Sequence, residues 1–238
     1  MQTDKNTAYG GMEELLNVEF SMPGYNGFIV NLIHRHLADC RRVVDFGAGI
    51  GTLSTLYAQK TGALPLCVEI DAAGQSTLKS RGFPVYGSLS GISGDIDGIY
   101  SSNVLEHIED DAAVMRQMYD KLRPGGRLVL YLPAFQMLFS GLDASVGHYR
   151  RYGRADLCSK LKSAGFEIAS VRYADAAGFF AALAVKLLGY DAEKGLGSQA
   201  SLRLYDRFVF PISRELDALG LRFLFGKNIA VMAVKPDV

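Results

Sequence analysis

A glycine-rich turn between a strand-like run and a helix-like run constrains the fold of this chain most strongly. The run VVDF at 43–46 has strand character, GAGIG follows at 47–51, and residues 52–60 read as a helix. Glycine permits a sharp strand-to-helix turn and lets a ligand approach the backbone without meeting a Cβ atom. Dinucleotide-binding turns carry their third glycine where this chain has Thr52, so the spacing argues against a nicotinamide dinucleotide.

Strand and helix patterns alternate along the rest of the chain. A leading helix is expected over 24–39, Asp71 is a good N-cap for another, and a third begins at Asp110 or Asp111. The expected strands are 43–46, 64–70, 84–86, 96–101, 127–132, 166–173 and 229–234. This rhythm with short connections predicts an α/β fold of the Rossmann-like, doubly wound type, with helices on both faces of a largely parallel sheet.

The pattern changes in the second half of the chain. Residues 134–153 are irregular and rich in aromatic and polar side chains, 176–190 reads as an apolar helix, and 191–200 reads as a loop. An apolar stripe along 201–219 predicts a further helix, which Pro211 should kink. Core packing is the default interpretation of these apolar helices, and a lid or a dimer face are left open.

Length and composition fit one globular domain. The chain has 238 residues, of which 49% are apolar and 21% charged, close to globular averages. Its 25 basic and 25 acidic side chains cancel, so no overall field attracts it to nucleic acid or to an anionic membrane. We expect a single domain over 1–238 made of a helical lead-in (1–39), a cofactor-binding core (40–133), an acceptor-side segment with a helical insert (134–225) and a final strand (226–238).

The cysteines and the chain's apolar runs bear on its location. Cys40, Cys67 and Cys158 have neither metal-ligand spacing nor the pattern of a disulfide framework, so we expect free thiols and no metal site. The N-terminal residues lack the apolar core of a signal peptide. The longest apolar run, 176–190, contains Lys186 and is shorter than the ~20 residues of a membrane span. These features predict a cytoplasmic protein with no membrane span and no nucleic-acid partner.

Two acidic residues flank the glycine turn. Asp45 lies just before the glycines, where a carboxylate attracts a positive ligand group; capping of the turn is the alternative. Glu69 ends the next expected strand, where a carboxylate can accept from both hydroxyls of a ribose; a solvated strand end is the alternative. Asp71 competes for the ribose role but is better placed as the helix cap. The pair suits a ligand with a positive group and a ribose but no phosphate.

Several segments resemble the class I S-adenosylmethionine-dependent methyltransferase superfamily, and together they extend over nearly the whole chain. SSNVLEHIEDD (101–111) is similar to the family segment beneath the cofactor, and KLRPGGRLVLYLPA (121–134) to the helix, turn and strand that follow. Three segments resemble a bacterial subgroup often linked with glycosyltransferases: YNGFIVNLI (25–33), LDASVGHYRRY (142–152) and FGKNIAVMAVKP (225–236). The resemblance implies strand order 3-2-1-4-5-7-6 with only strand 7 antiparallel.

The resemblance implies S-adenosylmethionine as the cofactor, with its methionine part wrapped by the glycine turn. Ile70 would pack on the adenine, and Asn103 and Val104 would lie beside the sulfonium. Ser88 stands where the subgroup usually has an aspartate facing the adenine amine; its hydroxyl accepts one hydrogen bond, and the Leu89 backbone contributes. With the two acids, the expected cofactor contacts are Asp45, Gly47, Ala48, Gly49, Gly51, Glu69, Ile70, Ser88, Leu89, Asn103 and Val104.

Acceptor binding is expected at the segment that follows the fifth strand. Methyl transfer is an in-line displacement helped by positioning, and a hydroxyl or amine acceptor also needs a general base. His107 and His148 are the candidate bases, although His107 also fits a helix start bonded to backbone. Substrate contacts are expected from Tyr25, Tyr149, Arg151 and Tyr152. The alternative is that the arginines of GHYRRY only pin the loop to carboxylates.

These expectations describe an enzyme that methylates oxygen or nitrogen of a small molecule or a sugar-containing metabolite. Two other functions are left open: another nucleoside-binding transferase, such as an aminopropyl transferase, and a non-catalytic binding subunit that retains the fold. Aminopropyl transferases normally add a cluster of acidic residues that binds a polyamine, and we see no such cluster after the fourth strand. The intact Asp45, glycine turn and Glu69 argue against a decayed site. A homodimer is also left open.

Overall fold

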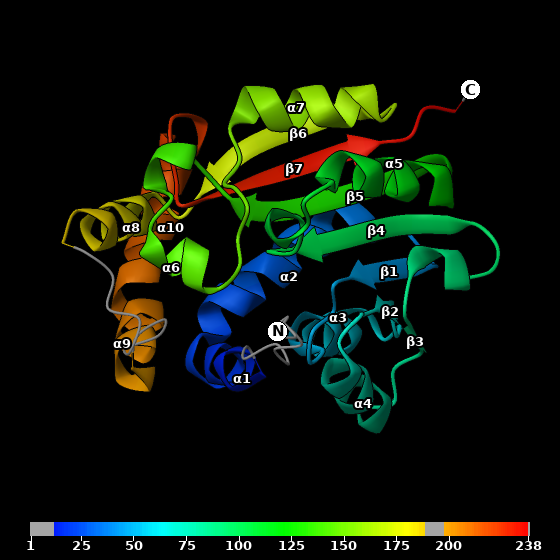
Figure 1. The fold of residues 1–238 in the computed structure, drawn as a ribbon, viewed down its shortest axis with the longest axis horizontal. Helices are drawn as coiled ribbons and strands as arrows, with labels where there is room; N and C mark the ends of the chain where they lie inside the picture. Colours follow the sequence, from blue (N-terminus) through cyan, green and yellow to red (C-terminus); the bar gives the residue numbers. More distant parts are fainter. Residues whose placement is uncertain (1–11, 189–197, 238) are drawn as a thin grey trace, which may run out of the picture.

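The computed structural model describes residues 12–188 and 198–237, and these contain a seven-stranded sheet (Figure 1). The strands are β1 (Val43–Phe46), β2 (Leu66–Val68), β3 (Val85–Tyr86), β4 (Ile96–Ser102), β5 (Leu122–Pro133), β6 (Glu167–Ala174) and β7 (Asn228–Val234). Their order is β3-β2-β1-β4-β5-β7-β6, and β7 runs antiparallel to both of its neighbours. The other pairs are parallel, so the predicted topology is confirmed.

Helices lie on both faces of the sheet, as predicted. On one face lie α2 (Pro23–Leu37) and α3 (Thr52–Thr61), and on the other α5 (Asp111–Lys121) and α7 (Arg154–Ser163) (Figure 1). Two further helices are α1 (Met12–Ser21), which precedes α2, and α4 (Ala72–Ser80), which joins β2 to β3.

Strand β5 shows why the sheet is apolar on both faces. Leu128 and Leu130 belong to the core beneath α5 and α7, whereas Val129 and Tyr131 belong to the core beneath α2 and α3. Successive side chains of a strand point to opposite faces, so a sheet covered on both sides needs apolar residues at every position. The strand starts earlier than expected, at Leu122, and its register with β4 shifts before Arg127.

Two predicted helix boundaries are confirmed. Asp71 is the N-cap of α4, and its carboxylate accepts a hydrogen bond from the Gly74 N–H at 2.8 Å. Gly62 is the C-cap of α3 with a φ of 74°, and its N–H donates to the Ala58 carbonyl at 2.8 Å. Both residues satisfy backbone groups that a helix end leaves without partners.

The segment after β5 is more regular than the sequence predicted. Within 134–153, α6 (Gly141–Ser145) forms a short helix, and Ala134 makes an isolated parallel bridge with Tyr152. Ser140 and Asp143 form a capping box, in which the Asp143 carboxylate accepts from the Ser140 N–H at 2.9 Å. A helix of this length is too short to leave an apolar period in the sequence.

The helical insert lies at one end of the sheet (Figure 1). It consists of α8 (Ala176–Leu188), α9 (Gln199–Leu204), a π-helical turn (Tyr205–Val209) and α10 (Phe210–Ala218). Pro211 was expected to kink this helix, and the helix is irregular at the π-helical turn just before it. Pro211 itself lies in the first turn of α10, where its missing N–H is tolerated. Residues 191–197 of the expected loop lie outside the described residues.

Among the described helices, none is long and apolar enough to cross a membrane.

The apolar stripe predicted along 201–219 faces the core only in part: Leu202 and Tyr205 pack against the core beneath α2, whereas three other residues of the stripe face solvent, so the default interpretation was wrong for these three. Phe208, Ile212 and Leu219 are 56%, 60% and 84% exposed. Ser213 and Asp217 face inward instead and accept hydrogen bonds from backbone N–H groups at the start of α8. The unsatisfied donors at a helix start therefore orient α10 more strongly than its apolar side chains do.

Candidate active site

The predicted cofactor residues gather at the carboxyl ends of β1, β2 and β4, the edge where open α/β sheets bind ligands. The glycine turn leaves β1, Glu69 follows β2, and Asn103 follows β4. Asn103 has a φ of 51°, a left-handed conformation that asparagine tolerates better than most residues. Its N–H donates to the Tyr131 carbonyl at 2.8 Å, which fixes this chain reversal at the end of β4.

The glycine turn has a backbone that side chains rarely permit. Gly47, Gly49 and Gly51 have φ values of 76°, 55° and 87°. A Cβ atom at Gly47 would overlap the side chain of Val104, which places the glycine turn in contact with the residues after β4. The Ala48 N–H donates to the carbonyl at the end of β2 at 3.0 Å, which holds the turn across the sheet edge.

Glu69 joins the glycine turn to the end of β2. The residue is 9% exposed, and its Oε2 accepts from the Gly49 N–H at 2.7 Å. Its Oε1 accepts from the N–H groups of Ile70 and Asp71, both at 2.8 Å. A carboxylate has about four acceptor positions, so one remains for a ligand hydroxyl. The Ile70 side chain beside it is 87% exposed, an unusual position for an apolar group and one that suits a flat apolar ligand surface.

Asp45 is buried beneath the turn and is 3% exposed. Its Oδ2 accepts a hydrogen bond from the Ser54 hydroxyl on α3 at 2.6 Å. Burial raises the pKa of Asp45 to about 7, although the bond from Ser54 acts in the opposite direction. A nearby positive ligand group would favour the ionised carboxylate.

Asp45→Asn should stabilise the unligated protein, and increasingly so as the pH rises. Since the pKa of Asp45 is about 7 in the folded chain and its ordinary value is 3.8, folding binds a proton between these pH values and stability falls as pH rises through them. Asparagine does not ionise, so the variant should gain roughly 2–4 kcal/mol at pH 8 and almost nothing at pH 4. Thermal unfolding across this pH range measures the difference; a gain independent of pH would refute the assignment.

The predicted adenine contacts lie beyond β3. Ser88 is exposed, and its hydroxyl lies 2.8 Å from that of Ser90. The Leu89 side chain is 4% exposed and belongs to the main core, so its backbone is the part available to a ligand.

Tyr25 reaches the same sheet edge from α2. Its hydroxyl donates to Asn228 Oδ1 at 3.1 Å, and the Asn228 amide donates to Asn103 Oδ1 at 3.3 Å. The Lys227 ammonium lies 5.1 Å from the centre of the Tyr25 ring. Burial raises the pKa of Tyr25, while Lys227 acts in the opposite direction. This polar chain links the leading helix to the end of β4.

The two predicted bases lie together. The rings of His107 and His148 meet edge to face, with centroids 4.5 Å apart. His148 Nδ1 lies 2.8 Å from Asp143 Oδ1, while its Nε2 lies 3.9 Å from Glu106 Oε1. Burial raises the pKa of Asp143, but the bonds from His148 and Arg151 hold it at about 2. Asp143 therefore fixes the His148 ring and directs Nε2 away from itself.

Glu106 and Asp143 are site residues that the sequence analysis missed. Glu106 is fully buried, and neither of its carboxylate oxygens has a hydrogen-bond partner among the described residues. Burial raises its pKa to about 8. The dipeptide Glu106-His107 and the spacing of Asp143 from His148 were visible signals, but only the fold brings the two segments together.

The remaining residues that were predicted to bind the acceptor differ in whether a ligand can reach them: Arg151 and Tyr149 have groups available to a ligand, and Tyr152 does not. Arg151 donates to Asp143 Oδ1 at 2.8 Å, and its buried Nη1 has no hydrogen-bond partner in the described part of the chain, which leaves a donor for a ligand. Tyr149 is 55% exposed. Tyr152 is fully buried in the core, and its hydroxyl donates to Asp111 at 2.8 Å. Tyr152 therefore holds the segment to α5 through a carboxylate. This is the structural role that the sequence left open for the arginines of GHYRRY.

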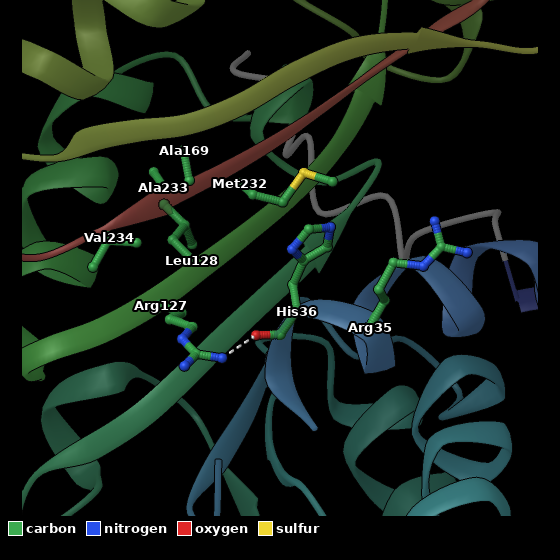
Figure 2. A pocket seen from close by; sticks show the side chains of 8 residues that line it. All are labelled: Arg35, His36, Arg127, Leu128, Ala169, Met232, Ala233 and Val234. Carbon is green, nitrogen blue, oxygen red and sulfur yellow. Dashed lines mark hydrogen bonds between the residues drawn. The ribbon is translucent and has the colours of Figure 1, made fainter. Parts of the chain in front are cut away.

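A cavity of about 180 Å³ lies away from these residues, at the other end of β5 and β7 (Figure 2). Arg35 and His36 from the end of α2 line it together with Arg127 at β5, and the Arg127 guanidinium donates to the His36 carbonyl at 2.8 Å. None of the predicted site residues lines this cavity.

Both the sequence and the fold of this chain are similar to those of known proteins. Residues 25–171 match the family model described as "Methyltransferase domain". Trans-aconitate 2-methyltransferase of Deinococcus radiodurans is 29% identical over 48% of this chain, which spans about half the length of that relative.

Two solved structures share the fold. A SAM-dependent methyltransferase from Archaeoglobus fulgidus has a TM-score of 0.59 and 17% identity, with 94% of this chain and 99% of that chain covered. Burkholderia thailandensis 1,6-didemethyltoxoflavin-N1-methyltransferase, solved with 1,6-didemethyltoxoflavin and S-adenosylhomocysteine bound, has a TM-score of 0.56 and 16% identity over 95% of this chain and 84% of its own. Since the family model matches more than half of the sequence, this chain belongs to the methyltransferase-domain family.

Proposed function

We propose that this protein transfers the methyl group of S-adenosylmethionine to oxygen or nitrogen of a small-molecule acceptor. One observation carries the proposal: Glu69 ties the strained glycine turn to the end of β2 and leaves the neighbouring Ile70 side chain exposed. The Glu69 carboxylate can accept a hydrogen bond from a ribose, and the exposed Ile70 side chain can pack against the adenine joined to that ribose. The S-adenosylhomocysteine bound to 1,6-didemethyltoxoflavin-N1-methyltransferase, which shares this fold, supports the choice of cofactor.

The cofactor's parts follow from the residues around the turn. One ribose hydroxyl would donate a hydrogen bond to Glu69, and the adenine would lie on Ile70. The methionine part would follow the backbone at 47–51, with its positive amino end towards Asp45. Because Val104 contacts this turn, the residues after β4 are the ones beside the sulfonium. No phosphate is required, in agreement with the departure from dinucleotide spacing.

The acceptor would bind where the residues after β4 meet those after α6. His148 is the proposed general base, because Asp143 holds Nδ1 and leaves Nε2 for a proton from the acceptor. The proton then passes to His148, the acceptor atom forms a bond to carbon, and the carbon–sulfur electron pair returns to sulfur. Arg151 Nη1 would orient a polar group of the acceptor.

Glu69→Ala should weaken S-adenosylmethionine binding by about 1–3 kcal/mol, the scale of a lost hydrogen bond to a charged group. The structure also predicts a loss of stability, because three backbone N–H groups lose their acceptor. Asp71→Ala is the matched control: it removes a helix cap worth about 1 kcal/mol but should leave affinity unchanged. Calorimetric titration measures affinity and thermal unfolding measures stability. Equal losses of affinity in both variants would move the ribose role away from Glu69.

The rival functions differ in what they require. An aminopropyl transferase needs carboxylates for a polyamine, whereas the acids of the proposed acceptor site are the buried Glu106 and Asp143, which is already paired with Arg151. Every residue in the proposed site comes from one chain, so a homodimer is not required. The cytoplasmic location stays a prediction, supported by the free thiols of Cys40, Cys67 and Cys158.

A further inference from the structure

Three side chains of metal-binding type meet at the acceptor side of the site. Glu106, His107 and His148 each offer one donor atom, and these atoms all lie within 4.8 Å of one another. Glu106 is 0% exposed, and both of its oxygens lack a hydrogen-bond partner among the residues that the structure describes. An ionised carboxylate buried without a partner is strongly unfavourable. A cation between the glutamate and the two imidazoles would supply the missing partner.

The surroundings of both histidines match those of metal ligands. His148 holds its Nδ1 against the Asp143 carboxylate at 2.8 Å, so its Nε2 is the nitrogen directed towards Glu106. A carboxylate behind a ligating histidine fixes the tautomer and the ring orientation at metal centres. The His107 ring has hydrogen bonds with backbone groups of Val146 and Gly147, another common arrangement behind a ligand.

We propose that Glu106, His107 and His148 bind a divalent transition-metal ion, with Zn²⁺ as the ion that this donor set fits best. Two nitrogens and one carboxylate oxygen are a ligand set of catalytic zinc sites, which leave a further position open. Mg²⁺ and Ca²⁺ prefer oxygen ligands and fit less well. Ligand bonds of about 2.1 Å place tetrahedral donors about 3.4 Å apart, so small side-chain rotations would close the present spacing.

The ion would define the acceptor class, a step that rests on the proposed function. An acceptor hydroxyl bound at the open position would have a lowered pKa, as metal-bound water does. It would lose its proton to solvent water before its oxygen forms the bond to the methyl carbon, and the carbon–sulfur electron pair would return to sulfur. In this form of the mechanism His148 is a ligand and the metal replaces it in activating the acceptor. The site therefore favours O-methylation of a hydroxyl compound.

Zinc titration of the full chain tests the metal site without using activity. Protein without an affinity tag is stripped with a chelator, dialysed and titrated with Zn²⁺ in a calorimeter, with no S-adenosylmethionine present. We expect one Zn²⁺ per chain, and binding at least ~10-fold weaker in Glu106→Gln and His148→Gln. His36→Gln is the control, because that side chain lines the distant cavity of Figure 2, and it should bind as the unmodified chain does.

Co²⁺ absorption, a substitute variant and a parallel cofactor titration give the zinc experiment a clear result even if one variant does not fold. Co²⁺ should give visible absorption bands with the unmodified chain and lose them with Glu106→Gln. If that variant fails to fold, Asp143→Asn takes its place, because it removes the carboxylate that orients His148. Absence of zinc binding, or equal binding by all variants, would overturn the proposal. A parallel titration with S-adenosylmethionine in chelator separates the two proposals: zinc binding without cofactor binding keeps the metal site and rejects the proposed function.

Discussion

Replacement of His148 by alanine is expected to reduce turnover by roughly 10²–10⁴ while S-adenosylmethionine binding stays near normal. The ring is held by Asp143 at 2.8 Å and faces both Glu106 and His107, and the two roles proposed for it are those of a base and of a metal ligand. Its ring partners in the described part of the chain are Asp143, Glu106 and His107, and none of these is expected to bind the cofactor. Formation of S-adenosylhomocysteine, measured across a panel of hydroxyl and amine compounds, reports turnover once an acceptor is found.

The control for His148→Ala is His36→Ala. Only the backbone carbonyl of His36 is used by Arg127, so loss of the ring should leave turnover unchanged. If His148→Ala unfolds at lower temperature but keeps its activity per folded molecule, the Asp143–His148 pair is a structural clamp. The acceptor site would then have to be sought nearer Tyr25 and Asn228.

The second large effect is expected from Gly49→Val, which should abolish cofactor binding. Gly49 has a φ of 55°, which a β-branched residue adopts only under strain, and its N–H donates to Glu69. Its side chain would also project towards Leu15 of α1, whose Cδ1 lies 3.3 Å from the position of an added Cβ. The turn would have to move, and with it the backbone that we propose the methionine part of the cofactor follows.

Gly62→Val is the control that separates the effect of backbone strain from the loss of the cofactor site. Gly62 has a φ of 74° and no neighbour within 4 Å of an added Cβ, so it imposes the same kind of strain away from the cofactor. This control should lose stability and keep its affinity for S-adenosylmethionine, measured by calorimetry. If Gly49→Val also keeps its affinity, the turn has only a structural role and the cofactor site lies elsewhere.

The sequence predicted the fold well because the fold depends on local signals. The apolar run at β5 and the caps at Asp71 and Gly62 are set by neighbouring residues, and the structure confirms them. The strand order came from the family resemblance, since alternation alone does not determine which strands pair. The local signal failed in α10, where inward-facing Ser213 and Asp217 bind the start of α8.

The candidate site was less predictable, because its contacts join distant segments. Glu106 is adjacent to a residue that the sequence analysis selected, yet its burial without a partner depends on how residues after α6 fold over it. Tyr152 was selected for its setting in GHYRRY, but its hydroxyl is taken up by Asp111 in the core. The spacing of Asp143 from His148 was visible in the sequence, but its contacts with His148 and Arg151 form only once α6 has folded.

Titration of the purified chain with S-adenosylmethionine tests the central claim most directly. We predict saturable binding at one site per chain, competition by S-adenosylhomocysteine, and loss of binding in Gly49→Val but not in Gly62→Val. A folded protein that binds neither compound would contradict the proposed function, whatever the result of the zinc titration.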